Sequence, residues 1–219
     1  METLAYMAKN LPVIGARTLE HLSIVGVAVM VAIATGVALG VFIARRPRLA
    51  PAVLSVGAMV ITVPSIALFG MLIPVLSMIG QGIGWLPAVI AVYIYSMVPI
   101  VRNTYTALNG LDPALSDAAT GMGMAPAQRL WRVELPNALP VIMAGVRIAV
   151  VMNIGIAAVA AYIGAGGLGT FISRGITQTD IRQLLTGAVS ISVLAIVADY
   201  GLLLVQRALT PHGLRMQPA

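Results

Sequence analysis

Long apolar runs constrain this chain more than any other feature, and the first covers residues 22–44 without a charged side chain. An α-helix needs about 20 apolar residues to cross the hydrocarbon core of a bilayer. The run at 50–79 is longer and contains Pro64 and Pro74, which predict a bent or broken span. The sequence therefore predicts an all-α membrane protein with about five spans, the others covering residues 86–108, 137–163 and 183–207.

Composition excludes several other classes of protein. With 59% apolar and only 9% charged residues, the chain cannot cover a soluble domain with a charged surface. The net charge of +6 does not indicate nucleic acid binding, because the arginines flank the apolar runs. The absence of cysteine excludes disulfides, zinc thiolates and thiol catalysis, and His21 and His212 lie near the two ends of the chain, which argues against a histidine metal site. We expect neither metal nor cofactor.

Three shorter segments carry weaker signals. Residues 1–20 mix charged with apolar positions and contain Pro12 and Gly15, which predicts a short surface helix with breaks and no cleaved signal peptide. Gly36 and Gly40 form a small-xxx-small pair, which favours close approach of another helix. Residues 164–179 are rich in glycine and predict a flexible outer loop.

The arginines predict the orientation of the spans. Five spans alternate sides, so residues 45–49, 109–136 and the C-terminal tail share one face. The positive-inside rule places this face in the cytoplasm and the N-terminus outside. The cytoplasmic face would hold Arg45, Arg46, Arg48, Arg129, Arg132, Arg207 and Arg215, with Arg102 close to it, against Lys9, Arg17, Arg174 and Arg182 outside.

The longest polar interruption, residues 109–136, predicts two short helices. Asp112 is a good N-cap for a helix that starts at Pro113 and reaches about Gly121, and Pro126 restarts a second helix that should stop before Pro136. On the first helix one face is small and apolar, since Ala114, Ala118 and Met122 are spaced by four. Such a helix outside the membrane suits a groove on another protein.

The same interruption resembles the EAA loop of binding-protein-dependent ABC importer permeases. That pattern is Glu-Ala-Ala, a glycine four residues after the second alanine, then an aliphatic residue and Leu-Pro at fixed distance. This chain has Asp for Glu and Val for Ile but keeps the register: Asp117, Ala118, Ala119, Gly123, Val133, Leu135 and Pro136.

The wider sequence is similar to permeases that import the osmoprotectants glycine betaine, carnitine and choline. The stretches that carry this similarity are 62–70, 98–105, 134–145 and 163–169. The resemblance implies the type I ABC importer permease (MetI-like) fold in a prokaryotic cell membrane, with an ATPase, a second permease subunit and an external binding protein as partners. A non-identical second permease is slightly favoured. The residues implied to lie in the ATPase contact are Asp117, Ala118, Ala119 and Gly123, with Leu135 and Pro136 ending the second helix.

Two further sequence patterns argue against nucleotide binding by this chain. Gly164–Gly169 matches the dinucleotide fingerprint G-x-G-x-x-G, but it follows a membrane helix rather than a strand, and no acidic residue lies about 20 positions further on. Lys9 is the only lysine, so no P-loop of the G-x-x-x-x-G-K-[ST] type exists. We therefore expect a transport subunit and not an enzyme, with ATP hydrolysed by a separate polypeptide.

Arg147 and Asp199 lie inside apolar runs, where a charge is costly. Each is about 12–15 Å along its helix from the predicted cytoplasmic side, at about 1.5 Å per residue. They can therefore form an intramembrane charge pair; separate partners are the alternative, and a proton carrier is a remote third.

A quaternary ammonium group is best held by aromatic faces. Candidates for the substrate path are Tyr93, Tyr95, Tyr105, Tyr162 and Trp85, together with Asn153 in mid-span, although aromatic residues favour membrane interfaces in any case and Asn153 suits helix packing. Three rival functions stay open: a permease of this type for an amino acid or oxyanion, a membrane scaffold, and an intramembrane enzyme, for which Asp199 is the sole acidic residue within the spans.

Overall fold

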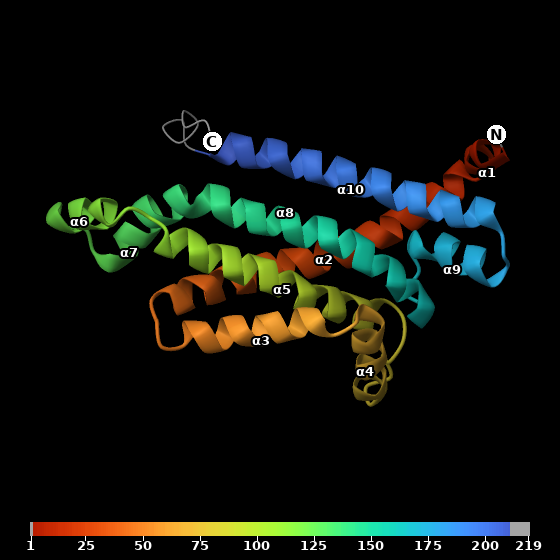
Figure 1. Ribbon diagram of the computed structural model, residues 1–219, viewed down its shortest axis with the longest axis horizontal. Coiled ribbons are helices and arrows are strands. Elements are labelled where there is room, and N and C mark those ends of the chain that lie inside the picture. The colour runs from red at the N-terminus through yellow and green to blue at the C-terminus, as the bar shows by residue number, and fades with distance from the viewer. Residues whose placement is uncertain (1, 211–219) are drawn as a thin grey trace.

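The computed structural model describes residues 2–210, so His212 and Arg215 lie outside the described residues. Every regular element in this part of the chain is helical. The long helices run roughly along one axis, with α6 and α7 at one end and α1 and α9 at the other (Figure 1). We call these the α6 end and the α9 end. The elements are α1 (Glu2–Lys9), α2 (Leu11–Ala44), α3 (Ala50–Thr62), α4 (Ser65–Ser77), α5 (Trp85–Asn109), α6 (Pro113–Gly121), α7 (Pro126–Arg129), η1 (Leu130–Glu134), α8 (Leu135–Val159), η2 (Ala160–Ile163), α9 (Gly169–Thr177) and α10 (Ile181–Leu209).

The helices agree with the predicted membrane architecture. Four helical segments within residues 2–210 are long and apolar enough to cross a bilayer, and α3 with α4 supplies a fifth span if the bent pair counts as one. The four are α2, α5, α10 and the continuous stretch Pro126–Ile163. The fold is therefore that of an all-α membrane protein with four or five spans.

The first spanning helix starts earlier than expected, because α2 is continuous from Leu11 to Ala44. Pro12 does not break it, since a proline in the first helical turn lacks only an N–H that would be unpaired there anyway. Gly15 lies inside the helix, and no atom lies close to its Cβ position. It therefore lowers the helix propensity of this segment without ending the helix. The predicted surface helix shrinks to α1.

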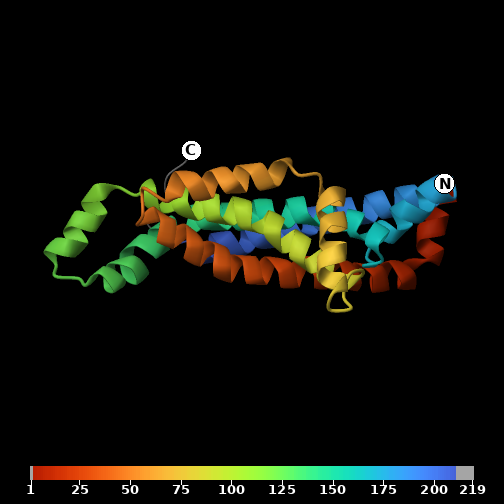
Figure 2. The same ribbon diagram turned by 90° about the horizontal axis from the view of Figure 1, so that it is seen from below.

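The second run is broken at Pro64 and not at Pro74. Val63 is extended, as the residue before a proline prefers, and α4 turns about 100° away from α3. Figure 2 shows α4 across the direction of the other helices. The hydroxyl of Tyr95 on α5 donates to the Val63 carbonyl at 2.5 Å, which satisfies one acceptor that the break exposes. Pro74 lies inside α4 without ending it.

Helix α5 is the centre of the bundle, and glycines bring its neighbours close. A Cβ built on Gly36 would lie 2.9 Å from Ile100, and one on Gly40 would lie 2.5 Å from Thr104. On the other side, a Cβ on Gly145 of α8 would lie 2.6 Å from Asn103. The small-xxx-small pair of α2 therefore packs directly on α5, as the sequence predicted.

The helix that starts at Pro126 does not stop before Pro136, contrary to the prediction. It passes through the π-helical turn η1 into α8, and the N–H of Leu135 donates to the carbonyl of Leu130, five residues back. The wide turn lies directly before Pro136, whose ring would clash with the preceding turn of a regular α-helix. Leu135 and Pro136 therefore begin α8 rather than ending a separate helix.

The glycine-rich segment at the α9 end is partly helical, whereas the sequence predicted a flexible loop. Gly164, Gly166 and Gly167 have positive φ and turn the chain, and α9 then begins at Gly169. A Cβ on Gly169 would overlap the carbonyl of Ala158, so this turn lies against the end of α8.

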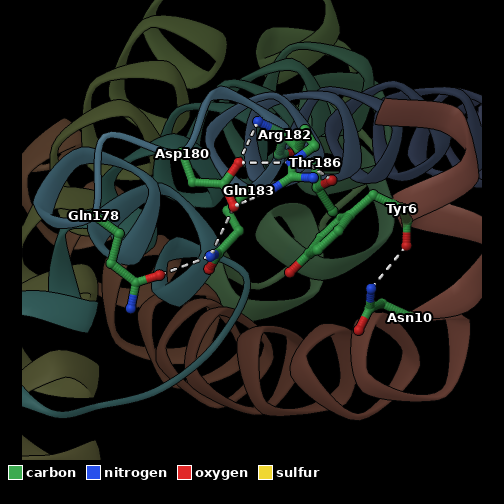
Figure 3. Close-up of polar contacts among 7 residues, drawn as sticks. All are labelled: Tyr6, Asn10, Gln178, Asp180, Arg182, Gln183 and Thr186. Atoms are coloured by element: carbon green, nitrogen blue, oxygen red, sulfur yellow. Dashed lines mark hydrogen bonds and ion pairs between the residues drawn. The ribbon is translucent and has the colours of Figure 1, made fainter. Parts of the chain in front are cut away.

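The turn from α9 to α10 is held by polar side chains. Asp180 caps α10 by accepting from the Arg182 backbone N–H at 3.0 Å and from the Arg182 side chain at 3.1 Å. The side chain of Gln183 donates to Asp180 and to Gln178, beside Tyr6 and Asn10 of the N-terminal helices (Figure 3). Hydrogen bonding to Arg182 lowers the pKa of the Asp180 carboxyl to about 2, so this cap stays ionised.

Candidate functional site

The polar segment between α5 and α8 forms a short helix, α6, at the end of the bundle (Figure 1). The Asp112 side chain accepts from the Ala114 N–H at 2.9 Å, which is the predicted N-cap, and Pro113 follows in the first turn. Nine residues are too few for a helix to be stable alone in water. The helix is therefore held by its caps and by contacts with the segment after it.

Gly123 ends this helix in a specific way. Its φ is +77°, its N–H donates to the Thr120 carbonyl at 2.9 Å, and the N–H of Met124 donates to the Ala119 carbonyl at 3.1 Å. These two bonds define a Schellman motif, in which the residue after the C-cap is left-handed and is usually glycine. The fixed glycine of the motif thus has a local conformational reason.

The two faces of α6 differ. Ala114, Ala118 and Met122 are exposed, so the small apolar face expected from the sequence is open for contact, and Asp117 is exposed as well. Ala119 is 1% exposed and therefore faces the chain itself. Of the two alanines in the motif, only Ala118 is accessible to another protein.

A polar network at the base of α6 was not foreseen from the sequence. The carboxylate of Glu134 in η1 accepts from the Arg129 Nε at 2.8 Å and from the Arg45 Nη2 at 3.1 Å. The Arg129 Nη1 also donates to the Thr120 hydroxyl at 3.2 Å. The network thus joins α6, α7, η1 and the end of α2. A lone acidic residue in an arginine-rich segment is the sequence signal that indicates such a contact.

Arg147 on α8 and Asp199 on α10 lie together in the middle of their helices. The Arg147 Nη2 is 2.8 Å and 2.9 Å from the two carboxylate oxygens, and its Nε is 2.9 Å from Oδ1. Gln206 accepts from Arg147 at 3.3 Å and donates to the Pro140 carbonyl at 3.1 Å. Both charges are thus paired, and no separate partner is needed.

The comparison with family models identifies the chain's family. Residues 36–212 match the model described as "Binding-protein-dependent transport system inner membrane component", well over half of the chain. The chain belongs to this family. It is therefore a multi-pass inner membrane permease of an ABC transporter and is not itself an ATPase, and membership implies an ATPase and a binding protein as partners.

Individual relatives of the permease are similar over nearly its full length. It is 54% identical to the osmoprotectant import permease protein OsmW of Salmonella typhimurium, over 98% of this chain and 100% of that protein. It is 40% identical to the choline transport system permease protein OpuBB of Bacillus subtilis, over 91% of this chain and 89% of that protein.

A solved structure shares the fold. The inward-facing MetNI methionine ABC transporter matches with a TM-score of 0.79 at 24% identity, covering 90% of the permease and 96% of that chain. At this identity the match speaks for the fold alone. It agrees with the MetI-like fold that the family resemblance implied.

Three of the six candidates for a substrate path, Tyr95, Asn153 and Tyr162, lie in the bundle core or at the α9 end. Tyr95 and Asn153 are buried. The Tyr95 hydroxyl donates to the Val63 carbonyl, and the Asn153 Nδ2 donates to Ser96 at 2.8 Å, whereas the Asn153 Oδ1 has no hydrogen-bond partner within residues 2–210. Tyr162 is half exposed in η2, at the α9 end.

Tyr93 is placed differently. It lines a cavity of about 290 Å³ between α2, α3 and α5, and its hydroxyl is 3.2 Å from that of Thr35. Apart from Tyr93, the lining is mostly apolar, with Met97 in the wall and Arg102 as its one charged residue. Of the six candidates, Tyr93 is therefore the one that lines this cavity, which is of a size to hold a small ligand.

The α9 end holds two contacts that the sequence analysis missed. Glu20 on α2 accepts from the Gly167 N–H at 2.8 Å and from Arg17 at 2.7 Å. His21 is fully buried, and its Nε2 donates to the Ile154 carbonyl at 2.9 Å. Both contacts tie the glycine-rich turn and α8 to α2, so the histidine has a structural role.

Proposed function

We propose that this permease imports a quaternary-ammonium osmoprotectant, such as glycine betaine, carnitine or choline, from a binding protein into the cytoplasm. The observation that carries the proposal is the 54% identity, over 98% of the chain, to a permease described as an osmoprotectant importer. The relative at 40% identity is described as a choline transport permease. Movement across the membrane is by alternating access, in which the permease opens to one side at a time.

Helix α6 is the coupling helix in this proposal and contacts the ATPase. Its exposed face carries Ala114 and Ala118, with Met122 following as the C-cap, and Asp117 adds an exposed charge beside it. Gly123 supports the contact by ending the helix sharply. Ala119 supports the contact indirectly, because it lies on the buried face of α6 and packs against the rest of the chain.

The proposed orientation places the α6 end in the cytoplasm and the α9 end, with the N-terminus, outside. The exposed arginines support this, since Arg45, Arg46, Arg48 and Arg132 gather at the α6 end. A second permease subunit completes the channel, with a related but non-identical chain slightly favoured. The substrate path then passes between subunits, with Tyr93 as the candidate contact.

Uptake in a deletion strain tests the solute. A strain that lacks this chain and all other osmoprotectant uptake should regain uptake of labelled choline or glycine betaine when the chain is restored. Unlabelled carnitine should compete, whereas an amino acid or an oxyanion should not. Uptake that is the same with and without the chain for all three quaternary amines would exclude the proposal.

A further inference from the structure

Glu134 joins parts of the chain that are far apart in sequence. Arg45 is 89 residues away and caps the end of α2, whereas Arg129 is in α7 and contacts Thr120 of α6. The bonds run in series from Thr120 to Arg129, then to Glu134 and to Arg45. Each of the three links is between 2.8 and 3.2 Å.

The π-helical turn makes this series possible. In a regular α-helix with 3.6 residues per turn, residues five apart lie about 140° apart around the axis. The wider turn of η1 pairs each N–H with the carbonyl five residues back, which brings residues five apart closer to one face. Arg129 and Glu134 are five apart, so the irregular turn lets Glu134 reach Arg129 while it also reaches Arg45.

The charges explain why a carboxylate is needed at this position. The Glu134 side chain is 13% exposed, less than those of Arg45 and Arg129, which are 40% and 30% exposed. Without its charge, the two guanidinium groups would face each other across a shielded space and repel. The network would then separate where α2 meets η1.

We propose that Glu134 is a positioning residue for coupling, which makes α6, the base of α8 and the end of α2 move as one body. The inference rests on the proposed role of α6 in contacting the ATPase. A docked helix can only drive alternating access if its displacement reaches the spans. α8 continues from η1 through the backbone. The end of α2 is joined to η1 by the Arg45–Glu134 ion pair, in addition to the packing of α2 on α5.

Spin-label distances test the proposal without reference to the solute. The chain has no cysteine, so Leu115→Cys on α6 and Phe42→Cys on α2 give two exposed attachment sites in the assembled transporter. The distribution of distances between the labels should be narrow. Its mean should be the same without nucleotide and with ATP and vanadate. Glu134→Gln should broaden it. An equally narrow distribution in Glu134→Gln, or a wild-type distance that changes with nucleotide, would overturn the proposal.

Transport per ATP hydrolysed gives a second readout in liposomes with the cognate partners. Glu134→Gln should reduce the ratio at least five-fold, Arg129→Gln should do the same, and the double variant should be no worse, because the two residues share one contact. Arg132→Gln is the matched control, since Arg132 is exposed on the same turn and forms no ion pair within residues 2–210. Proportional loss of transport and hydrolysis in Glu134→Gln would show a merely structural role. If the wild type moves none of the three solutes, the solute proposal fails, and the distances still decide the role of Glu134.

Discussion

Arg147 of α8 and Asp199 of α10 form a two-pronged ion pair, with the Arg147 Nη2 2.8 Å and 2.9 Å from the two carboxylate oxygens. The pair matters because no residue in the second half of α10 is fully buried. The fully buried residues of α10, Thr186 and Gly187, are both near its start, against α9. The ion pair and Gln206 therefore hold the second half of α10 to α8.

Replacing one member of this pair should lower the stability of the protein more than replacing both. Arg147→Met or Asp199→Leu alone should each lower the free energy of unfolding by roughly 2 kcal/mol, because the remaining charge loses its partner in a largely apolar region. The double variant should recover most of the loss. Thermal unfolding in detergent measures this, with Arg207→Met as the control at an exposed arginine. Additive losses would show that the two charges are not coupled.

Gly123 should tolerate residues that accept a left-handed backbone. With φ at +77° and open space around its Cβ position, Gly123→Asn should keep more than half of wild-type uptake. Gly123→Arg should leave the protein in the membrane yet abolish uptake, because a bulky charge beside α6 blocks contact with the ATPase. Uptake, membrane content and co-purification of the ATPase are the measurements. Normal transport by Gly123→Arg would refute the docking role of this loop.

Thr179 should be replaceable with a gain in stability. It is the one non-glycine residue with positive φ, at +54°, within residues 2–210. It follows α9 as Gly123 follows α6, with the Asp180 N–H donating to the Gly175 carbonyl at 2.9 Å. Glycine avoids the strain of a β-branched side chain there, so Thr179→Gly should raise stability by about 1 kcal/mol. Thermal unfolding checks the gain; Thr179→Val should show none.

Gly169 and Gly201 should respond in opposite ways to the same change. A Cβ at Gly169 would overlap the Ala158 carbonyl, so Gly169→Ala should separate α9 from the end of α8 and lower stability by about 2 kcal/mol or more. At Gly201, inside α10, nothing lies near the Cβ position, so Gly201→Ala should be neutral or stabilise by about 0.5–1 kcal/mol. Yield and thermal unfolding measure both. Equal effects would contradict the close packing at Gly169.

Much of the local structure was predictable because it depends on neighbouring residues alone. The N-cap at Asp112 and the glycine that ends α6 both follow from short-range patterns. The spacing of Gly36 and Gly40 predicted close helix packing, but it did not identify α5 as the partner helix. Helix continuity was less predictable. Pro12 and Pro136 were expected to break or end helices, but one falls in a first turn and the other follows a π turn.

The sequence alone determined the membrane class, the approximate spans and the family, because apolar length and motif spacing are properties of consecutive residues. Tertiary structure decided which distant polar groups meet. Glu134 reaches Arg45 across 89 residues, and Glu20 reaches Gly167 across 147, and no local pattern encodes such partners. In an apolar bundle an unpaired polar group is costly, and the packing of the helices selects which partner it meets. That selection places Glu134 between α6 and α2.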